Sequence, residues 1–213
     1  MAKKARQRAT SINNFVNINI TELDFTGEWE LAFGKPQKGG IWYVSGTPGS
    51  GKTSFIVQLI KVFAELGMRV RFYNFEEQVS KPLQEAIIRE RVTDVAENVV
   101  MINEVIPYSE IKKELETTRT HVAIIDSRKK ARLTSKQVEE LRERFPNITI
   151  VIICHVKPNG TPEQTADSTV FQEATLKIKV DRYRALSMGR YFGERGYYNV
   201  WKEKADQCWA ENI

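Results

Sequence analysis

The sequence has little cysteine and no long hydrophobic run, and both shortages narrow the class of protein. Cys154 and Cys208 are its only cysteines, which leaves no disulfide framework and no closely spaced metal ligands. No apolar stretch approaches the length of a membrane span, and the first residues lack the apolar centre of a signal peptide. We therefore expect a cytoplasmic protein with no membrane association.

Acidic residues are missing from the first ten positions, where the basic residues are Lys3, Lys4, Arg6 and Arg8. The whole chain has a net charge of +5, so the remainder is nearly neutral and any attraction for polyanions must be local. We expect residues 1–14 to form a disordered basic tail and residues 15–213 to form one domain. The tail fits either an arm that grips nucleic-acid phosphates or a solubilising extension.

Several apolar runs are continuous rather than alternating, which is typical of parallel strands buried on both faces. These runs cover residues 41–44, 70–75, 99–102, 122–125 and 148–154. Helical patterns occur at about 54–63, 80–91, 110–118 and 135–144, the last with Ser135 as its N-cap signal. After residue 160 shorter, alternating pieces at 176–180, 185–191 and 197–202 predict antiparallel strands. The predicted class is α/β, a mostly parallel sheet flanked by helices with a C-terminal antiparallel extension.

Residues 46–53 form a complete phosphate-loop motif, Gly-Thr-Pro-Gly-Ser-Gly-Lys-Thr. An apolar strand precedes it and a helical pattern follows it, so backbone N–H groups and the positive helix end would face a polyphosphate. Lys52 would reach the β- and γ-phosphates, and the Thr53 hydroxyl would ligate Mg²⁺. The motif predicts an ATP and Mg²⁺ site that comprises Gly46, Thr47, Pro48, Gly49, Ser50, Gly51, Lys52, Thr53 and Ser54.

Acidic and imidazole side chains follow the other predicted strands, at the edge where open α/β sheets bind ligands. Asp126 ends the strand at 122–125 and is expected to hold Mg²⁺ through water. Glu76 and Glu77 follow the strand at 70–75, where either could polarise an attacking water or simply begin a helix. His155 follows the strand at 148–154 as a candidate γ-phosphate sensor or a structural residue.

The order of these motifs resembles the RecA-like ATPase core, and it is most similar to the RadA and DnaB branch. The resemblance spans about residues 17–203 and includes the phosphate loop, Tyr73-Asn74-Phe75-Glu76-Glu77, Ile124-Ile125-Asp126-Ser127 and His155-Val156-Lys157-Pro158-Asn159-Gly160. It implies that Glu76 is the catalytic glutamate and that single-stranded DNA is a partner. It also implies ATP hydrolysis between subunits of a homo-oligomeric ring or filament, a hexamer included.

Parts of the family pattern are absent or shifted in this sequence. The zinc ribbon and the protease-like domain of full-length RadA are missing, as is the helical N-terminal domain of DnaB. The family's trans-acting strand corresponds to Gly189-Arg190-Tyr191-Phe192-Gly193, in which Arg190 stands one position from the family's arginine. A shift of one residue turns a strand side chain to the other face. Arg190 is therefore a candidate arginine finger in a displaced position.

Two loops that line the DNA path in RecA-like cores have different compositions here. The first, residues 127–136, contains no acid and offers Arg128, Lys129, Lys130, Arg132 and Lys136 as phosphate contacts. The alternative is a solvated basic loop. The second, residues 157–168, has Lys157 as its only cation beside two acids, and we expect it to be mobile.

These observations predict a DNA-dependent ATPase that acts in DNA recombination, repair or replication as a motor or helicase-like core. A regulatory ATPase of the KaiC type is one alternative, because the same core can serve assembly rather than DNA. A P-loop kinase of small molecules is another, although the sequence shows no arginine-rich lid.

Overall fold

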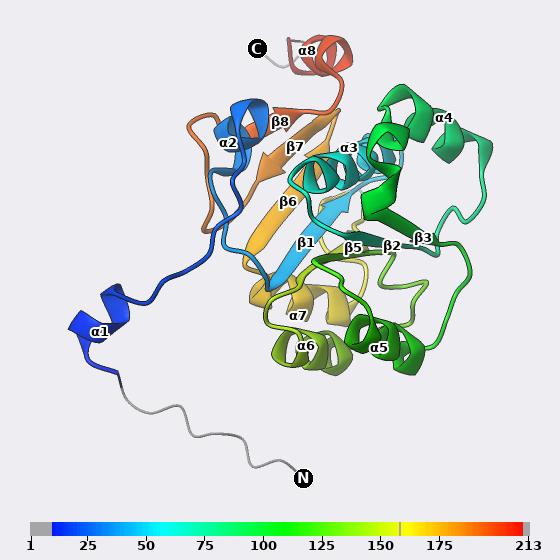
Figure 1. Ribbon diagram of the computed structural model, residues 1–213. Helices are drawn as coiled ribbons and strands as arrows, with labels where there is room; N and C mark the ends of the chain where they lie inside the picture. Colours follow the sequence, from blue (N-terminus) through cyan, green and yellow to red (C-terminus); the bar gives the residue numbers. More distant parts are fainter. Residues whose placement is uncertain (1–9, 158, 211–213) are drawn as a thin grey trace.

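A computed structural model describes residues 10–157 and 159–210. The body of the molecule has three layers, a central sheet between two layers of helices (Figure 1). The strands are β1 (Ile41–Gly46), β2 (Val70–Asn74), β3 (Val99–Ile102), β4 (Val122–Asp126), β5 (Thr149–His155), β6 (Leu176–Asp181), β7 (Arg184–Ser187) and β8 (Tyr197–Asn199). Their order across the sheet is β3-β2-β4-β5-β1-β6-β7-β8. The first six strands in this order pair in parallel. The pairs β6–β7 and β7–β8 are antiparallel. The predicted α/β class is confirmed.

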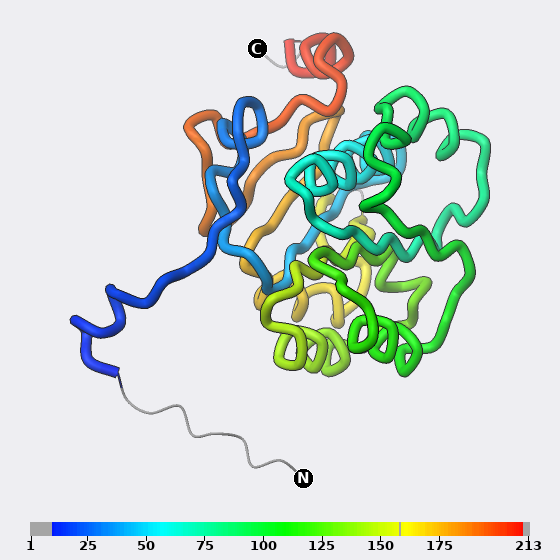
Figure 2. Tube along the Cα trace, in the orientation of Figure 1, coloured from blue at the N-terminus to red at the C-terminus, as the bar shows by residue number. Residues whose placement is uncertain are grey.

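Helices cover both faces of the sheet (Figures 1 and 2). One face packs against α2 (Gly27–Phe33), α3 (Lys52–Glu65), α4 (Lys81–Arg89) and the 3₁₀ helix η1 (Val92–Asn98). The other packs against α5 (Tyr108–Thr117), α6 (Ser135–Arg144) and α7 (Thr165–Glu173). The short helix α1 (Ile12–Val16) lies apart from the body, and α8 (Lys202–Ala210) follows β8 at the end of the described chain.

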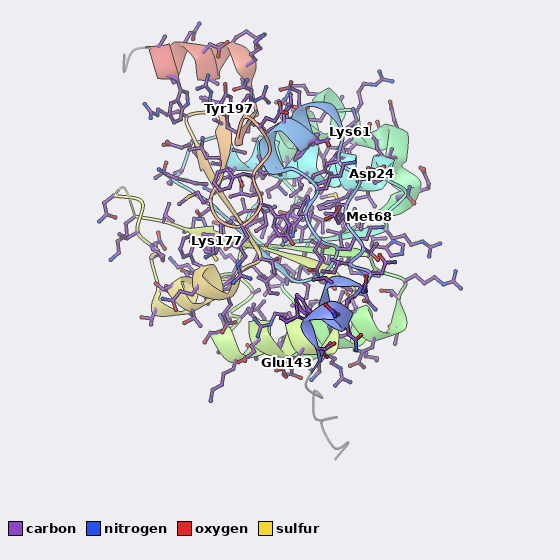
Figure 3. The ribbon with its side chains drawn as sticks, turned by 90° about the vertical axis from the view of Figure 1, so that its left-hand side faces the viewer. Asp24, Lys61, Met68, Glu143, Lys177 and Tyr197 are labelled. Carbon is purple, nitrogen blue, oxygen red and sulfur yellow. The ribbon has the colours of Figure 1, made fainter. Side chains whose placement is uncertain are left out.

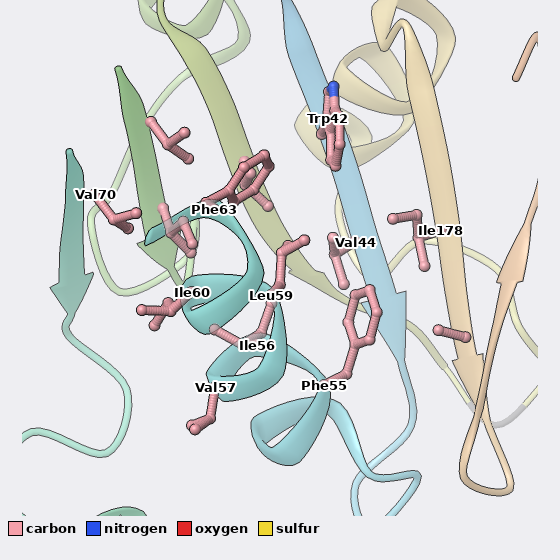
Figure 4. Packing of buried hydrophobic residues seen from close by; sticks show 14 of the residues in the cluster. Trp42, Val44, Phe55, Ile56, Val57, Leu59, Ile60, Phe63, Val70 and Ile178 are labelled. Atoms are coloured by element: carbon pink, nitrogen blue, oxygen red, sulfur yellow. The ribbon is translucent and has the colours of Figure 1, made fainter. Parts of the chain in front are cut away.

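The continuous apolar strands build two cores because alternate side chains point to opposite faces. In β1, Trp42 and Val44 pack toward α3, whereas Ile41 and Tyr43 belong to the core beneath α5 to α7. Figure 4 shows Leu59 and Phe63 of α3 turned toward this central strand. In Figure 3, side chains fill the space between the layers, and Glu143 of α6 lies on the outer surface.

Several local expectations were wrong. The strand at 176–181 is parallel to β1, so the antiparallel extension begins only at β7. Thr134, not Ser135, is the N-cap of α6, because its side chain accepts a hydrogen bond from the Gln137 N–H. Helix α7 begins inside the segment expected to be a mobile loop.

A short helix lies across the expected N-terminal boundary. Helix α1 crosses residue 14, so part of the predicted tail is helical. The basic residues at positions 3, 4, 6 and 8 lie outside the described residues. In the described part of the chain, no helix has both the length and the hydropathy needed to cross a membrane.

Candidate functional site

The phosphate loop joins β1, which ends at Gly46, to α3, which begins at Lys52. Gly49 and Gly51 have φ angles of 76° and 99°, a region that L side chains rarely adopt. A Cβ atom on Gly46 would lie 2.4 Å from the carbonyl oxygen of Val180. The loop therefore needs glycine for both its conformation and its close approach to β6.

Two polar side chains of this loop, those of Lys52 and Ser50, have no side-chain partner among the described residues. Lys52 Nζ donates hydrogen bonds to the carbonyl oxygens of Gly46 (2.8 Å) and Thr47 (3.1 Å). Within the described part of the chain the buried Ser50 Oγ has no hydrogen-bond partner, and buried polar groups are normally paired. Burial lowers the pKa of Lys52, although the charges of Asp126, Glu76 and Glu163 oppose this shift. A desolvated cation beside an unpaired hydroxyl fits a polyphosphate.

Strand register brings the predicted acidic residues and His155 to the same edge as the phosphate loop. Gly46 is the register partner of His155, and Asn74 is the partner of Asp126. The two glutamates after β2 occupy different positions. Glu76 Oε2 accepts a hydrogen bond from Ser127 Oγ (2.9 Å) and lies 3.5 Å from His155 Nε2.

Glu77 instead faces the phosphate loop. Its carboxylate accepts hydrogen bonds from Thr53 Oγ1 (2.7 Å) and Ser80 Oγ (3.1 Å). The structure thus separates a glutamate beside Ser127 and His155 from a glutamate beside Thr53. Sequence spacing alone did not distinguish the surroundings of these two neighbours.

Asp126 lies where a divalent cation would relieve an electrostatic cost. Burial raises its pKa to about 7, the charges of Glu76 and Glu77 add to the rise, and Lys52 opposes it. Among the described residues, no group of three or more His, Cys, Asp or Glu side chains forms a metal cage. Mg²⁺ commonly uses one or two protein ligands and completes its shell with water and phosphate oxygens. Thr53 and Asp126 fit that pattern.

Arg128 is buried, which argues against the expectation that it contacts DNA. Its side chain is 4% exposed and forms an ion pair with Asp167, whose side chain is 3% exposed. The guanidinium also donates hydrogen bonds to the Leu133 carbonyl and to Gln164 Oε1. Because the charge is enclosed and paired, Arg128 ties the basic loop to α7 rather than offering a phosphate contact.

The other cations of the basic loop are exposed. Ala131 and Leu133 are buried, so the chain makes a tight turn whose basic side chains project outward. Lys129 pairs with Glu163 at 3.1 Å. The remaining exposed cations near this edge are Lys130, Arg132, Lys136 and Lys157. This turn follows Asp126 directly in the sequence.

Arg190 is not brought to the phosphate loop. Strand β7 ends at Ser187, and Arg190 is exposed in the connection that follows. A residue that sequence analysis missed, Tyr183, does reach the loop. Its N–H donates to the Ser50 carbonyl (3.0 Å), and its ring lies 3.1 Å from where a Cβ on Gly51 would be. No motif marks this contact, because it arises from the turn between β6 and β7.

Comparisons with known proteins agree with this geometry. No protein-family model matches the sequence. The chain is 25% identical over 205 residues to the DNA repair protein RadA of Helicobacter pylori strain J99, covering 89% of this chain and 45% of that protein. The RadA protein of strain 26695 is 25% identical over 172 residues, with 74% and 38% covered. The chain thus spans less than half the length of these curated relatives.

A solved structure gives a similarity of fold. The KaiC-like protein of the archaeon Pyrococcus horikoshii superposes with a TM-score of 0.57 at 15% identity, covering 84% of this chain and 99% of that one. At this level of sequence identity, the match shows only that the two folds are similar. Together with the sheet order and the phosphate loop between β1 and α3, these similarities show that the chain is built on a RecA-like ATPase core.

Proposed function

We propose that this chain is an ATP hydrolase of the RecA type whose turnover is stimulated by DNA, in recombination, repair or replication. The observation that supports it best is the edge where the phosphate loop meets the ends of β2, β4 and β5. A lysine, a hydroxyl and three acidic side chains gather there from separate segments. Such a constellation fits phosphoryl transfer to water, which depends on positioning and charge stabilisation.

Each residue has a role that its surroundings support. Lys52 leaves the loop carbonyls and binds the β- and γ-phosphates, where its charge offsets the charge of the transferring group. Thr53 and Asp126 hold Mg²⁺, which when bound supplies charge neutralisation between the phosphates. Glu76 accepts the proton of the attacking water, and Ser127 and His155 hold its carboxylate in place.

The glutamate assignment is tested by a matched pair of variants. Glu76→Gln keeps the shape of the side chain and removes the base, so ATP binding should persist while hydrolysis falls about 10²-fold or more. Glu77→Gln should retain turnover at saturating Mg²⁺. Fluorescent-nucleotide binding and steady-state phosphate release measure the two properties. Loss of turnover in Glu77→Gln alone would reverse the assignment.

Stimulation by DNA is inferred from the exposed turn that follows Asp126. Lys129, Lys130 and Arg132 project from this turn, and phosphate contacts of this kind need no base sequence. Single-stranded DNA on the turn would act on the metal site through β4. The proposed RadA-like role therefore depends on a basic surface joined to the catalytic edge.

Charge reversal tests the DNA surface. The triple variant Lys129→Glu, Lys130→Glu and Arg132→Glu should lose DNA stimulation of the ATPase and keep ATP binding. A control with equal charge change reverses the exposed Lys38, Lys81 and Lys113. Wild-type affinity for unrelated single strands should fall steeply with salt, because bound phosphates release counterions. Equal DNA binding by the two triple variants would contradict the proposal.

Assembly completes the proposed site. Lys52 is the described cation that we assign to the phosphates, and the exposed cations near this edge are assigned to DNA. We infer that a neighbouring copy provides a further cation for the γ-phosphate, with Arg190 as the candidate. ATP and Mg²⁺ should then favour a ring or filament, such as a hexamer. The alternative function is a regulatory ATPase of the KaiC type, in which the same core serves assembly rather than DNA. Hydrolysis that is unchanged by any DNA would support that second function.

A further inference from the structure

The two-residue turn between β6 and β7 has an unfavourable backbone conformation. Its residues, Arg182 and Tyr183, have φ angles of 43° and 59°, a region that residues other than glycine rarely adopt. A hairpin turn of this length usually has Asn and Gly at these positions. Such strain persists only where surrounding contacts hold it, and it gathers at functional sites. The contacts of this turn therefore indicate what it does.

One set of contacts fixes the turn to the phosphate loop. The Tyr183 N–H donates to the Ser50 carbonyl at 3.0 Å, and the Tyr183 ring lies 3.1 Å from the position of a Cβ on Gly51. In a planar trans peptide the carbonyl and the following N–H point in opposite directions. The bond to Tyr183 therefore turns the Gly51 N–H away from the hairpin. Fixed orientation of backbone N–H groups is what allows such a loop to bind phosphate oxygens.

A second set of contacts fixes the same turn to helix α8, which lies beyond this end of β6 (Figure 1). The rings of Tyr183 and Trp201 meet edge to face, with 6.1 Å between their centroids. Lys204 Nζ lies 5.2 Å and 4.2 Å from the same two centroids. Trp209 Nε1 donates to the Arg182 carbonyl at 3.2 Å, and the Arg182 guanidinium lies over the Trp209 ring. Both residues of the turn are thus held by α8 and the residue before it.

We propose that Tyr183 is a positioning residue that couples α8 to the phosphate loop, so that packing of α8 raises the affinity of the loop for a polyphosphate. Helix α8 holds the turn in its unfavourable conformation. The turn in turn orients the Ser50–Gly51 peptide, and the Tyr183 ring limits the movement of Gly51. The inference rests on the proposed function, because it requires that a polyphosphate binds this loop.

Calorimetric titration of the full chain with tripolyphosphate and Mg²⁺ measures the coupling, because this ligand has no base that could contact α8 directly. Tyr183→Gly relieves the backbone strain and removes the ring, and the dissociation constant should rise about 10-fold as preorganisation is lost. Tyr183→Phe keeps the ring and should bind within about 2-fold of the wild-type chain. The control Arg91→Gly relieves a φ angle of 57° at the start of η1 and should leave binding unchanged. Urea unfolding confirms that each variant is folded.

A thermodynamic cycle tests whether α8 acts through Tyr183. Trp201→Ala removes the ring that packs against Tyr183 at the start of α8, and it should raise the dissociation constant about 3-fold. In the Tyr183→Gly background the same replacement should have no further effect. Additive losses, normal binding by Trp201→Ala, or unchanged binding by Tyr183→Gly would each overturn the coupling and leave the ATPase proposal standing. A wild-type chain that binds no tripolyphosphate would overturn both.

Discussion

The Arg128–Asp167 pair offers a prediction that separates a structural role from a DNA-binding role. Arg128 lies in the basic turn but is enclosed, with its guanidinium bonded to Asp167, Gln164 and the Leu133 carbonyl. Asp167 in turn accepts a hydrogen bond from the Gln164 N–H at 3.2 Å. Replacing Arg128 by alanine removes the cation and leaves the Asp167 carboxylate buried without it.

The expected loss of stability is large. Breaking a buried ion pair by removing one partner costs about 3–5 kcal/mol, because an uncompensated charge stays in the interior. A typical domain has only about 5–15 kcal/mol of stability, so Arg128→Ala should remove a substantial fraction of the protein's free energy of unfolding. The exposed neighbour Lys130 has no comparable environment, and Lys130→Ala should change stability by no more than about 0.5 kcal/mol.

Urea unfolding followed by circular dichroism compares the two variants with the wild-type chain. The paired replacement Arg128→Met and Asp167→Leu removes both charges, and it should recover much of the stability that Arg128→Ala loses. Equal unfolding midpoints for Arg128→Ala and Lys130→Ala would refute the structural role. In that case Arg128 would return to the set of possible DNA contacts.

Three further changes test other parts of the structure. The folded-state pKa of Asp126 is raised from 3.8 to about 7, so its cost to folding is absent below pH 4 and complete above pH 7. At about 1.4 kcal/mol per pKa unit, Asp126→Asn should stabilise the metal-free protein by up to about 4 kcal/mol at pH 8 and little at pH 4, measured by urea unfolding in chelator. Gly46→Ala should lose nucleotide binding and about 1–3 kcal/mol of stability, because the added methyl meets the Val180 carbonyl; unchanged nucleotide titration and melting would contradict this. Thr134→Ala should lower the free energy of unfolding by about 1 kcal/mol through loss of the α6 cap, and Ser135→Ala should not.

The sequence predicted the parallel part of the fold because burial on both faces leaves a strong signal. Strands such as Val99–Ile102 and Val122–Asp126 are short, apolar and continuous, and no helix pattern competes with them. The phosphate loop was equally visible, since its glycines, lysine and threonine have fixed spacing. Strand-end residues such as Asp126 and His155 followed from the rule that parallel strands share one ligand-binding edge.

The remaining features depend on contacts between residues far apart in the chain. Arg128 has the composition of a surface loop, and only its partners on α7 show that it is buried. Helix α7 itself buries little beyond Val170 and the charged Asp167, so its apolar pattern was too weak to predict. The contact of Tyr183 with the phosphate loop likewise depends on how the β6–β7 turn packs.

Glu77 is expected to tune Mg²⁺ affinity rather than activate water. Thr53 Oγ1 donates its proton to Glu77 at 2.7 Å, which leaves the oxygen lone pairs free to face a metal ion. Groups that orient a metal ligand in this way contribute about 10–100-fold in metal affinity. Glu77→Ala should therefore raise the Mg²⁺ concentration for half-maximal hydrolysis by about that factor, with turnover at saturating Mg²⁺ largely kept. An unchanged Mg²⁺ titration would show that the Thr53 hydroxyl does not need this acceptor, and the Glu77 carboxylate would then have no part in the metal site.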